Sequence, residues 1–225
     1  MGMEKIVFIG RPNSGKSSLF NQLTGLNQKI GNFSGVTVER KRGKFGHFEI
    51  NDLPGLHSLQ SSNLDEQISK QELFKLGEKD KIIFIANGMQ LEESLGLFSQ
   101  IADLQVPILL VINFKDELEK HGITIDLVAL KKRLGCNIIL LNARDGVGID
   151  ELKHLITTNG FSVPSALCRS HYDHFSEDGT YQNTYRTLLQ EEDNLAFWES
   201  DYFRRKTIVQ HIIKECTSKQ SSNYL

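Results

Sequence analysis

A glycine-rich segment near the N-terminus constrains the fold more than any other stretch of the chain. Residues 10–17 read Gly-Arg-Pro-Asn-Ser-Gly-Lys-Ser, between an apolar run (Lys5–Gly10) and a helical pattern (Gly15–Thr24). This is the strand–loop–helix arrangement of the G-x-x-x-x-G-K-[ST] signature. Glycines allow the tight turn and expose backbone N–H groups, and the following helix adds the positive end of its dipole. The segment therefore predicts a phosphate-binding loop at the end of a buried strand.

The polar side chains of this loop suit a nucleoside triphosphate and its metal ion. Lys16 supplies a mobile cation for the β- and γ-phosphates, and Ser17 supplies a hydroxyl for Mg²⁺. The other loop positions that we expect to contact the nucleotide are Gly10, Asn13, Ser14, Gly15 and Ser18.

Two shorter clusters of residues narrow the choice of nucleotide. Asp52-Leu-Pro-Gly55 follows a strand pattern, so Asp52 can hold Mg²⁺ through water and Gly55 can offer its N–H to the γ-phosphate. Asn113-Phe-Lys-Asp116 follows an apolar run, at the strand end where ligands of open α/β sheets bind. The Asp116 carboxylate can accept from the ring N–H and exocyclic amine of guanine, a donor pair that adenine lacks. The expected ligands are therefore GTP and GDP.

Strand-like and helix-like segments alternate through residues 5–160, which predicts a doubly wound, mostly parallel α/β sheet flanked by helices. The predicted strands are Lys5–Gly10, Val38–Phe45, His47–Asp52, Lys81–Asn87, Pro107–Asn113 and Asn137–Asn142. The predicted helices are Gly15–Thr24, Asp65–Leu76, Leu91–Leu104, Asp126–Leu134 and Ile149–Thr157. Gly46-His47 predicts a two-residue type II′ hairpin loop, and Asp126 and Gly135 are the expected cap and stop of one helix.

The pattern changes after Gly160. Residues 161–164 are predicted as a linker, and residues 184–198 and 202–216 have helical apolar spacing. We therefore expect a nucleotide-binding domain over 1–160 and a small α-helical domain over 161–225.

Composition excludes several classes of protein. The net charge of −2 argues against a chain held to nucleic acid by bulk charge. Its longest apolar runs have five residues (82–86 and 108–112), far short of the ~18–20 that a membrane span needs. Three widely spaced cysteines indicate reduced thiols. Cys168, His171 and His174 are interpreted as a polar surface loop rather than a metal site. The basic stretch Arg40–Arg42, with Lys44, is interpreted as a solvated strand edge rather than a contact for acidic lipid or a partner.

The motifs resemble those of a known family. With Asn142-Ala143-Arg144 after the last predicted strand, they form the ordered signature of translation-factor-related small GTPases. Residues 31–39, Gly-Asn-Phe-Ser-Gly-Val-Thr-Val-Glu, resemble switch I of FeoB, the prokaryotic ferrous-iron transport protein, and residues 52–59 are similar to its second switch. The resemblance covers residues 4–158 well and the remainder loosely.

This resemblance implies a P-loop GTPase and assigns roles to matching positions. Thr37 would coordinate Mg²⁺ and contact the γ-phosphate, with Gly35 and Val36 beside it. Asn113 and Asp116 would hold the base, and Ala143, flanked by Asn142 and Arg144, would donate its N–H to the guanine oxygen. Asn13 is the candidate ligand of a K⁺ ion beside the phosphates. The implied catalytic residues are Lys16, Thr37, Gly55 and Asn13, and the implied Mg²⁺ ligands are Ser17, Thr37 and Asp52.

The sequence departs from the FeoB pattern in places. Arg11 replaces the usual Asn, and Phe33-Ser34 replaces Trp-Pro. Leu56 stands where Ras-like enzymes carry the water-orienting glutamine, so we expect slow hydrolysis. His57 beside it is predicted to be a mobile surface side chain rather than a nucleotide contact.

The resemblance also implies partners. A membrane-embedded transporter domain would act with this chain, in cis or in trans, at the cytoplasmic face of the inner membrane; homo-oligomerisation is left open and nucleic acid is not expected. An alternative is an RNA- or ribosome-associated assembly GTPase of the Era/Der type, although the expected Thr-Thr-Arg pattern and basic stripe are missing. A third is a module that binds nucleotide without hydrolysing it.

Overall fold

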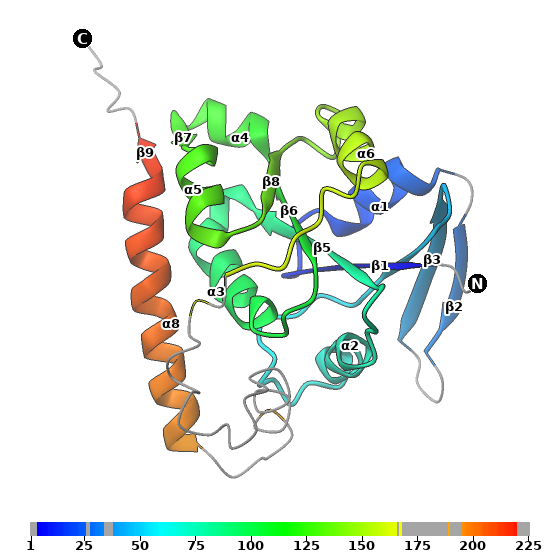
Figure 1. The fold of residues 1–225 in the computed structure, drawn as a ribbon, viewed down its shortest axis with the longest axis horizontal. Coiled ribbons are helices and arrows are strands. Elements are labelled where there is room, and N and C mark those ends of the chain that lie inside the picture. Colours follow the sequence, from blue (N-terminus) through cyan, green and yellow to red (C-terminus); the bar gives the residue numbers. More distant parts are fainter. Residues whose placement is uncertain are drawn as a thin grey trace.

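The computed structural model describes residues 4–25, 28–33, 38–165, 167, 189 and 195–219. Its centre is a seven-stranded sheet in the order β2-β3-β4-β1-β5-β6-β8 (Figure 1). The strands are β1 Lys5–Gly10, β2 Gln28–Asn32, β3 Glu39–Phe45, β4 Phe48–Asp52, β5 Lys81–Asn87, β6 Ile108–Asn113 and β8 Asn137–Leu140. Strand β3 runs antiparallel to β2 and β4, and all other pairs are parallel. The predicted mostly parallel α/β class is confirmed.

Helices cover both faces of the sheet. They are α1 Lys16–Thr24, α2 Leu64–Phe74, α3 Leu91–Ala102, α4 Lys115–Lys120, α5 Leu127–Leu134, α6 Ile149–Thr157 and α8 Leu195–Cys216, with a 3₁₀ turn, η1, at Gly88–Gln90. Strand β1 shows why two layers form: Val7 and Ile9 belong to the core under α2, α3 and α5, whereas Ile6 and Phe8 belong to the core under α1 and α6. Alternate side chains of a strand point to opposite faces, so a continuous apolar run needs cover on both.

Capping and turn residues in the sequence correctly indicate where several helices and strands begin or end. Asp126 caps α5 by accepting a hydrogen bond from the Ala129 N–H at 2.9 Å, and Gly135 ends the helix in the left-handed conformation, with φ 69°. In the predicted hairpin, Phe45 pairs with Phe48, and Gly46 has φ 58° while His47 has a negative φ. Positive φ at the first loop residue alone is what a type II′ turn requires.

Several short elements were missed by the sequence analysis. Strand β2 carries no apolar run because it lies at the sheet edge, where Ile30 is 69% exposed. A separate two-stranded sheet pairs β7 (Ile123–Ile125) with β9 (Thr217–Lys219). Three-residue strands and the six-residue helix α4 are too short for periodicity to reveal them.

The C-terminal region contains one continuous helix among its described residues, Leu195–Cys216, which joins the segments 184–198 and 202–216 that the apolar spacing separated. Asp201, between those two segments, is fully buried. Buried side chains recur along one face of α8 at Asp201, Arg205, Val209, Ile212 and Cys216. This face packs on α3 and α5 and shares their core (Figure 1). Most of residues 166–194 lie outside the described ranges, so the domain boundary at 160/161 remains a prediction.

A buried ionic cluster fixes α8 to α3. The Arg205 guanidinium lies 2.6 Å from Asp103 Oδ2 and 2.7 Å from Asp201 Oδ2, and it donates to the Ser99 carbonyl at 2.8 Å. None of the helices in the described ranges combines the length and apolar character needed to cross a membrane.

Candidate functional site

Parallel strands bring the sequence motifs to one edge of the sheet. The carboxyl ends of β1, β4 and β6 are Gly10, Asp52 and Asn113, and residues 141–144 follow β8. Two hollows lie along this edge. One, of about 500 Å³, is lined by the residues expected at the phosphates, and the other, of about 270 Å³, by those expected at the base.

Glycines in the loop of residues 10–17 are required by close contacts. Gly15 precedes α1 with φ 90°, a conformation that side chains rarely adopt, and a Cβ there would collide with the side-chain amide of Asn113. A Cβ on Gly10 would collide with the Ile85 carbonyl. Asn13 also has a left-handed backbone, with φ 62°. The loop thus presses against both β5 and the base-side loop.

The phosphate end brings a half-buried lysine and a buried carboxylate of opposite charge to one hollow. Lys16 and Asp52 line the 500 Å³ hollow with Ser17 and Gly55. Burial lowers the pKa of Lys16, and burial raises the pKa of Asp52 against the opposing effects of Lys16, Lys41 and the Ser17 hydroxyl. Asp52 is 8% exposed, and its Oδ1 finds no hydrogen-bond partner among the described residues. A buried oxygen without a partner is costly, so this atom suits a metal ion or its water shell.

The base end is organised by Asn113, which is 2% exposed. Its Nδ2 donates to the Ser14 carbonyl at 3.0 Å, and its Oδ1 accepts from the Ala143 N–H at 2.9 Å. Asn113 therefore ties the phosphate loop to the loop after β8. The Ala143 N–H, expected to donate to guanine, donates to Asn113 in this structure, because its single hydrogen takes the adjacent buried acceptor.

Asp116 lies in the first turn of α4 and lines the 270 Å³ hollow with Asn13, Ser18 and Arg144. Its Oδ2 is 3.8 Å from Lys120 Nζ, whereas its Oδ1 is buried and has no hydrogen-bond partner within the described ranges. This acceptor can take the donor pair of a guanine edge. Asn142 shapes the neighbouring loop by donating to Asp145 Oδ2 at 2.7 Å and accepting from the Arg144 N–H at 3.2 Å.

The segment after Asp52 packs on the phosphate loop. The Leu56 N–H donates to the Gly10 carbonyl at 3.1 Å, and a Cβ on Gly55 would lie 2.9 Å from the Pro12 nitrogen. Leu56 is fully buried, so its side chain cannot approach a bound phosphate.

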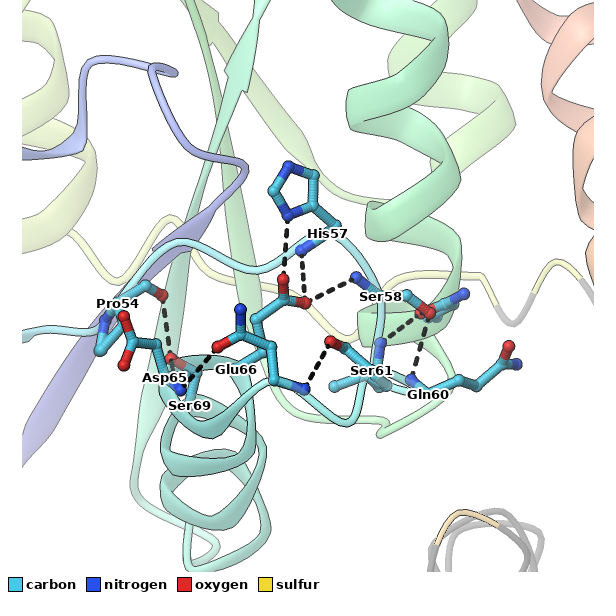
Figure 2. Close-up of polar contacts among 11 residues, drawn as sticks. Pro54, His57, Ser58, Gln60, Ser61, Asp65, Glu66 and Ser69 are labelled. Carbon is cyan, nitrogen blue, oxygen red and sulfur yellow. Dashed lines mark hydrogen bonds and ion pairs between the residues drawn. The ribbon is translucent and has the colours of Figure 1, made fainter. Parts of the chain in front are cut away.

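Two side chains that the sequence did not indicate hold this segment, and Figure 2 shows the contacts of one of them, Glu66. Glu66 on α2 accepts from the His57 N–H at 3.0 Å and the Ser58 N–H at 3.4 Å, and its Oε1 lies 3.0 Å from His57 Nδ1. Burial alone would raise the pKa of Glu66, but these hydrogen bonds lower it overall. Gln100 on α3 accepts from the Leu59 N–H at 2.8 Å. His57 lies at the surface as predicted, with its side chain 56% exposed, but its ring contacts Glu66, which the sequence did not indicate.

Some predicted positions cannot be placed. Gly35, Val36 and Thr37 lie outside the described residues, as do Cys168, His171 and His174. The structure therefore brings together the expected residues of the phosphate loop, Asp52, Gly55, Asn113, Asp116 and the 142–144 loop.

The family model for ferrous iron transport protein B matches residues 4–156. The chain belongs to the FeoB family. An Fe(2+) transporter FeoB from Leptospira biflexa is 46% identical over 161 residues, which are 70% of this chain and 23% of the relative. The corresponding protein of Escherichia coli O157:H7 is 43% identical over 156 residues, 66% of this chain and 20% of the relative. The chain thus spans about a quarter or less of these curated FeoB relatives. These matches do not favour the Era/Der alternative.

Solved FeoB structures extend the likeness beyond the region matched by the family model. The cytosolic domain of L. pneumophila FeoB superposes with a TM-score of 0.82 at 28% identity, covering 96% of this chain and all of that one. The cytosolic domain of T. maritima FeoB in its GMPPNP form gives a TM-score of 0.83, also at 28% identity, with the same coverage. With 96% of this chain covered, the FeoB fold includes helix α8.

Proposed function

We propose that this chain binds GTP and GDP and slowly hydrolyses GTP. The observation that carries the proposal is that two buried carboxylate oxygens, Asp52 Oδ1 and Asp116 Oδ1, have no hydrogen-bond partner among the described residues and lie one in each hollow. One suits the metal ion and the other the guanine edge, with the phosphate loop between them. The T. maritima relative, described in GMPPNP and GDP forms, supports this assignment.

The residues present fit Mg²⁺. The Ser17 hydroxyl and the Asp52 carboxylate are hard oxygen donors in one hollow, and the FeoB resemblance adds Thr37. When bound, the ion would neutralise charge on the β- and γ-phosphates. Lys16 would bind the same phosphates, and the backbone of residues 10–15 would supply N–H donors. Gly55 would offer its N–H to the γ-phosphate.

Slow hydrolysis follows from what lies beside the γ-phosphate position. Leu56 is buried and apolar, so no side chain at this position orients the attacking water. We infer that backbone groups and a monovalent cation supply what is missing, with Asn13 as the ligand of a K⁺ ion. The support for this role is the position of Asn13 within the phosphate loop, two residues before Gly15.

Hydrolysis assays with GTP and with ATP, each in K⁺ and in Na⁺, test the proposal. We expect turnover of GTP only, faster in K⁺, and loss of the K⁺ stimulation in Asn13→Ala. Turnover of ATP without GTP would overturn the base assignment. Equal rates in both salts would remove the K⁺ site while leaving the GTPase assignment intact.

We further propose that the chain is the nucleotide-responsive part of a ferrous-iron transport system at the cytoplasmic face of the inner membrane. The supporting observation is that the FeoB relatives are named Fe(2+) transporters and are about four times longer than the matched region. A membrane domain, in cis or in trans, would respond to the nucleotide state. Iron uptake by cells whose transporter carries this region, with and without Lys16→Ala, would test that link.

A further inference from the structure

A second lysine lies at the phosphate end of the site. Lys41 on β3 is the cross-strand neighbour of Asp52 on β4. Residues 39, 41 and 43 of β3 point to one face because alternate side chains of a strand do so. Gly43 on that face packs so tightly against Thr24 of α1 that a Cβ would collide. Lys41 therefore faces the side of the sheet that carries α1 and the phosphate loop.

The hollow itself confirms this direction. Lys41 lines the 500 Å³ hollow together with Lys16, Ser17, Asp52 and Gly55. The basic stretch 40–42 was interpreted as a solvated edge, but its middle residue turns inward and its neighbours do not line this hollow. Two lysines from different elements thus flank one buried carboxylate.

The present partner of Lys41 is weak. Its Nζ lies 3.7 Å from Glu39 Oε1, and the two side chains are 29% and 52% exposed. A pair of this length and exposure is loosely held and screened by solvent. The charge of Lys41 already acts on its neighbours: burial lowers the pKa of Lys16 and raises that of Asp52, and Lys41 adds to the first effect and opposes the second.

We propose that Lys41 recognises the third phosphate of the nucleotide, by exchanging Glu39 for the γ-phosphate and so favouring triphosphate over diphosphate. This rests on the proposed GTP binding. The γ-phosphate adds negative charge at the end of the site where Asp52 and Gly55 lie, and an ammonium group there gains a stronger, charge-assisted partner. It also supplies positive charge in a hollow whose lining, within the described residues, includes neither an arginine nor a glutamine.

Equilibrium binding of fluorescent GMPPNP and fluorescent GDP tests the proposal without hydrolysis. Lys41→Met should weaken GMPPNP binding by about tenfold or more and GDP binding by less than about threefold. Lys41→Arg should keep most of the GMPPNP affinity. Lys44→Met, on the same strand but exposed and outside the hollow, is the matched control and should leave both affinities unchanged.

The inference would be overturned if Lys41→Met bound GMPPNP and GDP as tightly as wild type does. It would also be overturned if the variant lost the same factor of affinity for both nucleotides. Thermal unfolding of each variant checks the fold, and Lys41→Gln provides a second neutral variant. Lys16→Ala separates the two proposals. If it retains nucleotide binding, GTP binding at this site fails; if it loses binding while Lys41→Met does not, only the role of Lys41 fails.

Discussion

Two clusters of charged side chains in this molecule differ in one respect. One is closed, with its charges paired inside the protein, and the other is open, because it borders a hollow. Around Arg205, the guanidinium is 2% exposed and lies between Asp103 and Asp201, both fully buried, with the Ser99 carbonyl as a further acceptor. Around Lys16 and Asp52, the charges border a 500 Å³ hollow, and Asp52 Oδ1 has no hydrogen-bond partner within the described part of the chain.

The difference separates a structural role from a binding role. In the closed cluster the cation is paired with both carboxylates inside the protein, so these contacts hold α8 against α3. An open cluster keeps unsatisfied charge that a ligand can complete, and such perturbed groups in a cleft mark functional sites. Removing a member of the first should affect folding, and removing a member of the second should affect binding.

Arg205→Met should give the largest effect. It leaves two carboxylates buried without their cation, and breaking such a cluster costs about 3–5 kcal/mol of unfolding free energy. Urea denaturation measures the loss, and the exposed Arg204→Met is the control. At low temperature the folded fraction should still bind GDP within a few-fold of wild type. A variant of unchanged stability would show that the closed cluster does not hold α8 in place.

Lys16→Ala should reverse that pattern. We expect GTP affinity to fall by about a hundredfold or more, since charge-assisted phosphate contacts are lost, while the protein remains folded. Fluorescent nucleotide binding and thermal unfolding, measured on the same sample, check both parts. Loss of stability without loss of binding would make the open cluster structural.

Asp116→Asn tests the base end of the open region. Replacing the acceptor oxygen with an amide removes the partner of the guanine donors and suits xanthine instead. GTP affinity should fall by about 10–100-fold, with xanthosine triphosphate gaining. Competition between the two nucleotides measures the change. An unchanged preference for GTP would place the base elsewhere.

Gln100→Ala probes the link between the two regions and should have a smaller effect. Gln100 is 7% exposed and accepts a hydrogen bond from the Leu59 N–H. It directly follows Ser99, whose carbonyl accepts from Arg205. Losing this hydrogen bond should cost about 1 kcal/mol and speed amide hydrogen exchange at residues 58–60. Unchanged exchange there would mean that α3 does not restrain this segment.

Cys136 should show almost no reactivity in the native protein, because its thiol is buried. It is 2% exposed, and burial raises the pKa of its thiol to about 12. The thiol therefore stays neutral at pH 8, and we expect it to react with a thiol reagent only after unfolding. Peptide mapping after labelling with and without urea checks this. Rapid labelling of the native protein would contradict the observed burial.

The open region was predictable from sequence and the closed one was not. The phosphate loop, Asp52 and Asp116 belong to short motifs whose residue types are dictated by contacts with phosphate, metal and base. The partners of Arg205 and the acceptors Glu66 and Gln100 come from separate elements, and only the packing of α8, α2 and α3 shows what they meet. Asn113 and Lys41 are intermediate cases. The motif of Asn113 and the strand of Lys41 were evident from the sequence, but the contacts and direction of the two side chains were not.

The most direct test of this account is competition for bound fluorescent GDP by GTP and by ATP, with Mg²⁺ and with a chelator. We expect GTP to displace the probe, ATP to fail at the same concentration, and the chelator to weaken GTP binding. Displacement by ATP as effective as that by GTP, or GTP binding that Lys16→Ala leaves intact, would contradict the assignment of this edge of the sheet as a guanine nucleotide site.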